Sequence, residues 1–254
     1  MLHWNADPTA FSLGPVSVRW YGIFFAVAFW QGLIFMRRAY VRAGYDPGEA
    51  DRLFGYIVIG VVVGARLGHC LIYEPAFYLS RPLEILKIWE GGLASHGGTA
   101  GLVFGAWLFF KRSGRADPFW LLDRLSVPAV LGGMCIRLGN FMNSEIVGLP
   151  AAVPWAVIFE RVDSLPRHPA QLYEALAYGV TALLLGAVSG SEAGRRKGVL
   201  AGWCLILVFG SRLVLEFFKT PQAAYEADFT LTVGQWLSVP VILAGCWLVR
   251  RRPS

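Results

Sequence analysis

Repeated long apolar runs constrain this chain more than any other feature. About seven of them approach the roughly 20 residues that a helix needs to cross the hydrocarbon of a bilayer. The runs lie near residues 20–36, 53–73, 93–110, 119–138, 171–188, 199–218 and 231–249. Only 16% of the 254 residues are charged, whereas soluble domains carry roughly 25%. The sequence therefore predicts an all-α, polytopic membrane protein in which residues 1–254 form a single integral membrane domain.

Lysine and arginine gather in short clusters after alternate runs, and these clusters orient the chain. Loops rich in Lys and Arg stay in the cytoplasm. The clusters lie at residues 37–42, 111–115, 195–197 and 250–252, and the intervening loops carry only isolated basic residues. This pattern explains the net charge of +6 as a topology signal and argues against nucleic acid as a partner. It predicts an extracytoplasmic N-terminus and a cytoplasmic C-terminus.

Glycine spacing and loop length predict how the bundle packs. Gly60, Gly64 and Gly68 are spaced four residues apart in the second run, and residues 97, 101 and 105 repeat this glycine pattern in the third. Such spacing lets helix backbones approach closely. The longest loop, near residues 140–169, is predicted to lie on the extracytoplasmic side and to fold over the bundle.

No sequence pattern requires a metal or a cofactor. The four cysteines lie singly inside apolar runs, without a second Cys or a His at metal-ligand spacing. The chain also lacks a zinc-protease helix motif, a phosphate-binding Gly-Lys-Ser loop and a dinucleotide fingerprint. The prediction is therefore no metal and no cofactor.

Ionisable residues within or beside the apolar runs gather at one depth. On insertion scales each costs about 2.5–3.5 kcal/mol at a helix centre, so each needs a reason. When the direction of each run is followed, they all fall in the outer leaflet: Arg66, His69, His96, Arg137, His168, Glu174, Arg212 and Glu216. Snorkelling or interhelical hydrogen bonds explain Arg66, His69 and Glu174 when each is taken alone. The shared depth predicts a polar, partly cationic cavity that opens toward the outer leaflet.

Arg137 and Arg212 point to a ligand for this cavity. Both lie in apolar sequence, and two guanidinium groups at one depth suit a phosphate, which Arg binds through a planar fork of donors. The abundant phosphate carrier of an outer leaflet is a phospholipid headgroup. The sequence therefore predicts that the two arginines bind a phospholipid.

Five short segments sharpen this interpretation. They are Arg19-Trp-Tyr-Gly at 19–22, Ser-His-Gly-Gly at 95–98, and the segments at residues 137–148, 167–174 and 212–219. Together, and in this order, they resemble the prolipoprotein diacylglyceryl transferase family. The Arg-Leu-Gly-Asn-Phe block that starts at Arg137, with its trailing Asn, Glu and Gly, is the most specific part of the resemblance.

The resemblance implies an activity, its partners and a location. The implied enzyme is a multi-pass protein of the bacterial cytoplasmic (inner) membrane with its active site on the extracytoplasmic side. It transfers the diacylglyceryl group of phosphatidylglycerol to the lipobox cysteine thiol of prolipoprotein signal peptides and releases glycerol 1-phosphate. Membrane lipids complete the partners. This reaction is the first step of bacterial lipoprotein maturation.

The resemblance also assigns roles to individual residues. Arg137 and Arg212 match arginines implicated in phospholipid binding and catalysis, and His96 matches the essential histidine. Other functionally important positions of the family correspond to Tyr21, Asn140, Glu145 and Gly148. The remaining predicted substrate-binding residues are Asn143, His168 and Glu216, which lie in the same motifs.

Two positions depart from the family pattern. Val208 stands where many members carry a tyrosine four residues before the second arginine, and Ile136 stands where Gly commonly precedes the first. Any role of that tyrosine hydroxyl is therefore either absent here or taken over by another residue such as Tyr21.

The implied reaction sets two chemical requirements. A cysteine thiol has a pKa near 8.5 and must lose its proton before it attacks. Negative charge also develops on the departing phosphate oxygen, where fixed donors stabilise the transition state. We expect Arg137 and Arg212 to stabilise this leaving group. His96 is either the base for the thiol or a hydrogen-bond donor to the headgroup.

Two other classes of protein compete with the enzyme interpretation. A multi-span transporter with an outer-leaflet anion site is the first, but transporters usually place their sites near the bilayer midplane, between internal repeats. The second is a seven-helix receptor or retinal protein, and no lysine occurs in the last run to hold a Schiff base. The sequence favours the enzyme.

Overall fold

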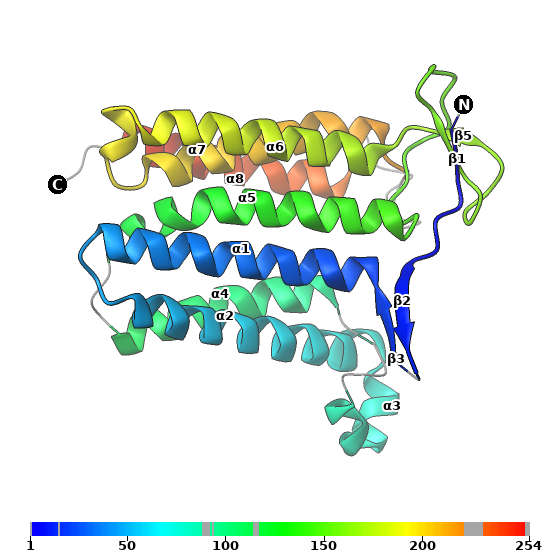
Figure 1. Ribbon diagram of the computed structural model, residues 1–254, viewed down its shortest axis with the longest axis horizontal. Helices are drawn as coiled ribbons and strands as arrows, with labels where there is room; N and C mark the ends of the chain where they lie inside the picture. Colours follow the sequence, from blue (N-terminus) through cyan, green and yellow to red (C-terminus); the bar gives the residue numbers. More distant parts are fainter. Residues whose placement is uncertain are drawn as a thin grey trace. The chain divides into compact units, whose positions relative to one another are not determined.

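The computed structural model describes residues 2–14, 16–87, 92, 94–113, 117–220 and 231–251. The chain is mostly helical, as predicted (Figure 1). The α-helices are α1 (Trp20–Arg42), α2 (Pro47–Gly68), α3 (Pro75–Ser80), α4 (Ser95–Ser113), α5 (Pro118–Met142), α6 (Ala170–Ser189), α7 (Val199–Leu215) and α8 (Val233–Arg250). Shorter turns are the π-helical η1 (His69–Tyr73) after α2, and the 3-10 turns η2 (Pro82–Leu86), η4 (Ala193–Arg195) and η5 (Glu216–Phe218).

Five helical stretches of the described residues are long and apolar enough to cross a membrane: Trp20–Arg42, Pro47–Tyr73, Pro118–Met142, Ala170–Ser189 and Val199–Phe218. They correspond to five of the predicted runs. The predicted runs 93–110 and 231–249 form helices α4 and α8, which are not among these five stretches. These five candidate spans agree with the predicted membrane protein, and the seven-span topology stays a prediction.

The described residues also contain five short strands, which the sequence pattern did not predict: β1 (Leu2–Trp4), β2 (Thr9–Leu13), β3 (Val16–Arg19), β4 (Val157–Phe159) and β5 (Pro166–Arg167). β1 pairs in parallel with β4, and β4 pairs antiparallel with β5. β2 and β3 form a separate antiparallel hairpin. These strands have only two to five residues, which is too short for an alternating pattern to reveal them.

The end of α5 also differs from the predicted boundary. The apolar run ends near residue 138, but α5 continues to Met142 and includes Asn140 in its last turn. The amide of Asn143 donates to the carbonyl of Gly139 (3.1 Å) and extends this last turn. Ser144 and Ile146 then adopt positive φ angles of 56° and 55°, which turn the chain away from the helix axis.

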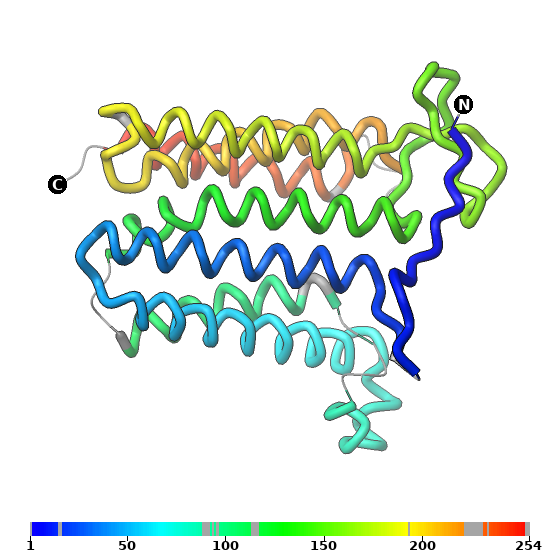
Figure 2. The backbone as a smooth tube through the Cα atoms, viewed as in Figure 1, coloured from blue at the N-terminus to red at the C-terminus, as the bar shows by residue number. Residues whose placement is uncertain are grey.

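The contacts divide the chain into two compact units, Met1–Phe35 with Phe119–Ser254, and Met36–Pro118. We call these unit 1 and unit 2. Nothing tests the prediction of a single membrane domain, and it stays a prediction. In unit 1, α5, α6, α7 and α8 run side by side (Figure 2). Their apolar core contains Val130 of α5, Tyr178 and Leu185 of α6, and Leu200 of α7.

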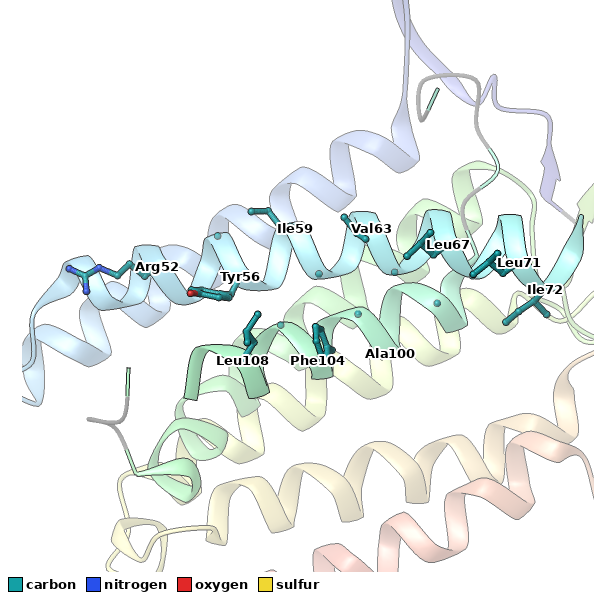
Figure 3. A pocket seen from close by; sticks show the side chains of 17 residues that line it. Arg52, Tyr56, Ile59, Val63, Leu67, Leu71, Ile72, Ala100, Phe104 and Leu108 are labelled. Atoms are coloured by element: carbon teal, nitrogen blue, oxygen red, sulfur yellow. The ribbon is translucent and has the colours of Figure 1, made fainter. Parts of the chain in front are cut away.

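In unit 2, α2 and α4 pack through the predicted glycines. A β-carbon at Gly60 or at Gly101 would overlap the other helix's backbone, and the same holds for Gly64 and Gly97. Close approach of the two backbones is thus confirmed. An apolar groove follows the pair and is lined by side chains such as Ile59, Val63 and Phe104 (Figure 3). No described side chain of the predicted site lines this groove.

Asp123 of α5 fixes the start of α7. Its carboxylate accepts hydrogen bonds from the amides of Gly198 (2.7 Å) and Ala201 (2.8 Å), which would otherwise lack partners at a helix N-terminus. Gly198 itself has φ +90°, a conformation that favours glycine. The contact sets the position of α7 relative to α5 at the end of unit 1 opposite the charged residues described below.

Candidate active site

A buried ion-pair network lies where the C-terminal ends of α5 and η5 approach the N-terminal end of α6. The Glu174 carboxylate is at its centre and is only 1% exposed. Its Oε2 pairs with Arg137 Nε at 2.9 Å, and its Oε1 pairs with Lys219 Nζ at 2.9 Å. Lys219 also contacts Glu216 Oε2 at 3.0 Å. A buried carboxylate needs such partners to remain charged, so the network holds three elements of unit 1 together.

The block that starts at Arg137 folds back on itself. Arg137 Nη1 donates to Asn140 Oδ1 (3.2 Å), because the two side chains are three residues apart on one helix face. Asn140 Nδ2 and Asn143 Nδ2 each donate to the Glu145 carboxylate at 3.1 Å. Gln171 of α6 donates to the Glu145 backbone carbonyl at 2.6 Å. These bonds orient Arg137 while Glu145 remains exposed.

Tyr21 of α1 joins this block. A β-carbon at Gly139 would lie 2.9 Å from Tyr21 Cδ2, so the absence of a side chain there lets the tyrosine ring lie against α5. The Tyr21 phenol interacts electrostatically with Glu145 and Arg137. The structure therefore brings four predicted residues together: Tyr21, Arg137, Asn140 and Glu145.

Arg212 approaches the same place from α7. At the start of α8, a β-carbon on Gly234 would lie 3.0 Å from Glu216 Oε1 and 3.4 Å from Arg212 Nη2. Glu216 is also joined through Lys219 to Glu174, which pairs with Arg137. The two arginines therefore lie at the same charged network, at one end of unit 1.

Lys219 is a site residue that the sequence interpretation missed. It appears there as an isolated basic residue after the sixth run, yet its side chain is 5% exposed and bridges two carboxylates. The available signal was its spacing of three residues from Glu216 on the helical extension of α7. Glu174 was likewise explained as an isolated structural residue, and the structure makes it the centre of the network.

Gly148 lies where three segments cross. Its amide donates to the His168 carbonyl (3.0 Å), and its own carbonyl accepts from Arg167 (3.0 Å) and Thr220 (3.1 Å). A β-carbon at this position would lie 2.6 Å from His168 Cβ and 2.7 Å from the Phe218 carbonyl oxygen. Only glycine fits, and the crossing holds the segment that contains Lys219, whose backbone pairs with Gly148.

His168 belongs to an aromatic cluster. Its Nδ1 lies 3.0 Å from the Tyr173 hydroxyl, which also accepts a hydrogen bond from Trp155 Nε1 at 2.7 Å. The ring also packs edge-on against Phe218, with 5.1 Å between ring centroids. The described contacts place His168 with these rings and not with the arginines.

The loop near residues 140–169 carries a partly buried ion pair as well. Arg167 donates to the Asp163 carboxylate through Nε at 3.1 Å. This hydrogen bonding lowers the pKa of Asp163 below its usual value. The pair and the aromatic cluster anchor the loop to the start of α6.

The remaining predicted polar residues belong to unit 2. Arg66 donates to the backbone carbonyls of Glu84 (2.6 Å), Ile85 (2.9 Å) and Gly92 (3.2 Å), so it holds a loop. His69 Nε2 lies 3.7 Å from Glu74 Oε1. His96 begins α4, but its side chain lies outside the part of the chain that the structure describes. Its predicted role stays a prediction.

Known proteins resemble this chain over nearly its whole length. The family model described as prolipoprotein diacylglyceryl transferase matches residues 8–251. Three relatives are named phosphatidylglycerol–prolipoprotein diacylglyceryl transferase. The one from Tolumonas auensis is 53% identical and aligns over 98% of this chain and 96% of its own length. Those from Chloroherpeton thalassium and an Azoarcus species are 47% and 41% identical over 98% of this chain, with 93% and 96% of their own lengths covered.

Proposed function

This chain belongs to the prolipoprotein diacylglyceryl transferase family, and from that premise we propose the reaction that it catalyses. It transfers the diacylglyceryl group from phosphatidylglycerol to the lipobox cysteine of a prolipoprotein signal peptide. The cysteine sulfur bonds to the glycerol carbon that carried the phosphate ester. The bond between that carbon and the phosphate oxygen breaks, its electron pair stays on the oxygen, and glycerol 1-phosphate leaves.

The observation that carries the proposal is the network that brings Arg137 and Arg212 to one end of unit 1. Glu174 joins Arg137 to Lys219, Lys219 joins Glu216, and Glu216 and Arg212 both approach Gly234. Two guanidinium groups there can bind the phosphate diester of the lipid and stabilise the charge that develops as the monoester leaves. Glu174 and Asn140 orient Arg137 before lipid binds. The same ion pairs hold Lys219 between Glu174 and Glu216, so lipid phosphate enters a site whose donors are already held in place.

The thiol proton needs an acceptor. We assign this role to His96, whose ordinary pKa of about 6.5 suits a base near neutral pH. The competing role is a hydrogen bond from His96 to the headgroup. A base makes the rate with a thiol peptide depend on pH through the pKa of His96, and a His96→Gln variant would lose that dependence. A headgroup donor would instead be reflected in the KM for the lipid.

The bacterial inner membrane fits the spanning helices and the family, and the finer topology is part of the proposal. The chain crosses the membrane seven times, with its N-terminus outside and its C-terminus in the cytoplasm. Two basic clusters of unit 1, at residues 195–197 and around 250, follow the ends of α6 and α8. The charged network lies at the opposite ends of those helices. Because basic clusters stay inside, the active site faces the extracytoplasmic side.

Purified protein in lipid nanodiscs with labelled phosphatidylglycerol and a lipobox peptide tests the reaction. The expected product is a peptide with a thioether-linked diacylglyceryl group, together with free glycerol 1-phosphate. Arg137→Ala should abolish product formation while the protein still inserts. Absence of thioether product from folded wild-type protein would overturn the proposal. Movement of an intact anion across the bilayer of sealed proteoliposomes would instead support a transporter.

A further inference from the structure

Side chains from three helices of unit 1 meet at two depths in the bundle, one helical turn apart. We call the depth of Arg137, Glu174 and Arg212 the charged level. On α5, Gly133 lies one turn before Arg137, and on α7, Val208 lies one turn before Arg212. On the intervening α6, Tyr178 lies one turn after Glu174. Residues four apart share a helix face, and α6 runs opposite to its neighbours. Tyr178 therefore lies one turn deeper than the charged level, together with Gly133 and Val208.

Packing at the deeper level fixes the tyrosine ring. Tyr178 is 8% exposed and belongs to the apolar core of unit 1, against which Val208 packs. A β-carbon at Gly133 would lie 3.2 Å from Tyr178 Cδ2 and Cε2, so the glycine leaves space for the ring to lie flat against α5. A ring held on both sides has little rotational freedom.

The position of the ring directs the hydroxyl toward the charged level. At that level Glu174, one turn before Tyr178 on α6, pairs with Arg137 Nε at 2.9 Å, and Arg212 lies one turn after Val208 on α7. A buried phenol needs a hydrogen-bond partner. A phenol oxygen can accept a hydrogen bond from a guanidinium group, whereas the apolar side chains around the ring cannot donate one.

We propose that the Tyr178 hydroxyl is a positioning group for the transfer reaction, holding the guanidinium groups of Arg137 and Arg212 at the separation that one lipid phosphate requires. This inference rests on the proposed function. Tyr178 lies on the core side of the two arginines and fixes the distance between their guanidinium groups. It does not itself touch the reacting carbon.

The test is Tyr178→Phe in the same nanodisc assay, which removes one oxygen and keeps the ring. The expected result is about a tenfold rise in the KM for phosphatidylglycerol, an unchanged KM for the lipobox peptide and an unchanged melting temperature. A general packing role would lower the melting temperature and alter both KM values. Tyr56→Phe in unit 2, which removes an exposed hydroxyl near Arg112, is the matched control and should behave like wild type.

A rescue experiment tests the role of the hydroxyl from α7, the helix that faces Tyr178. Adding Val208→Tyr to Tyr178→Phe returns a hydroxyl to this level from α7, and the KM for phosphatidylglycerol should fall back toward the wild-type value. A wild-type KM in Tyr178→Phe alone would overturn the inference. So would a folded double variant that is no better than the single one. A wild-type enzyme that makes no thioether product would overturn the proposed function instead, so the two failures are distinguishable.

Discussion

Arg137 and Glu174 form an ion pair between α5 and α6, with 2.9 Å between Nε and Oε2. The Arg137 side chain is 13% exposed and that of Glu174 only 1%, so little water screens the pair. Because Asn140 holds a second edge of the same guanidinium, Arg137 cannot rotate freely toward an incoming lipid. Preorganised donors of this kind need no reorientation as charge develops in the transition state.

Glu174→Gln tests the role of this pair. The substitution keeps the shape of the side chain but leaves Arg137 and Lys219 without their shared buried counter-charge. We expect a loss of stability of about 3–5 kcal/mol, the usual result of breaking a buried pair, and loss of transfer activity. Denaturation in detergent measures the first effect and the thioether assay the second.

Glu160→Gln is the matched control, because it removes one partner of the exposed His3–Glu160 pair in the same unit. Exposed pairs contribute little to stability, so its melting temperature should stay close to that of wild type at neutral pH. Equal destabilisation by the two substitutions would contradict the central place of Glu174 in the network.

Gly148→Ala should inactivate the enzyme through its backbone. The added β-carbon would push against His168 and the Phe218 carbonyl and shift the segment that carries Lys219. We expect at least a hundredfold lower kcat/KM, since a displacement of about 1 Å can cost that much. Gly186→Ala on α6 meets no atom within 4 Å and should leave kcat/KM unchanged. Normal turnover in Gly148→Ala would mean that the crossing does not position the site.

Asp123→Ala should destabilise unit 1 without touching the charged network. It removes both hydrogen bonds at the start of α7, and loss of a helix cap costs about 0.5–2 kcal/mol. Asp123→Asn retains an oxygen acceptor for one of the two amides and should cost less. Unfolding measurements on the two variants show which one loses more stability. An alanine variant as stable as wild type would show that the cap is dispensable.

Gly101→Ala tests the contact within unit 2. Its β-carbon would overlap the Gly60 carbonyl, so α2 and α4 must separate and lose packing contacts, which drive helix association in membranes. The melting temperature should fall. Gly55→Ala, on a face of α2 with no atom within 4 Å, is the control. Equal melting temperatures for the two variants would refute close packing.

The sequence predicts the helices well and the short strands poorly. Apolar runs such as 119–138 are visible because each position contributes to one long signal. Strand β5 has two residues and pairs with residues eight and ten positions earlier, so no local pattern reveals it. Asn140 was placed beyond the helix because apolar character ends before the helical hydrogen bonds do.

The candidate site was predictable only where residue type alone signals chemistry. Arg137 and Arg212 stand out as charges in apolar sequence. Lys219 does not, because burial of its amine depends on carboxylates from α6 and η5 that only the fold brings together. In the sequence Tyr178 looks like an ordinary apolar core residue. Only the alignment of α5, α6 and α7 shows that this residue lies one turn deeper than the arginines, with its hydroxyl directed toward them.

The claim that both arginines bind one phosphate is tested most directly by a double-mutant cycle. The quantity to measure is the dissociation constant for phosphatidylglycerol in nanodiscs for wild type, Arg137→Lys, Arg212→Lys and the double variant. Each lysine keeps the positive charge but loses the planar fork. If one phosphate joins the two guanidinium groups, the effects should be non-additive by about 0.5–3 kcal/mol. Additivity within about 0.5 kcal/mol would mean that the arginines act on separate groups, and would contradict the account.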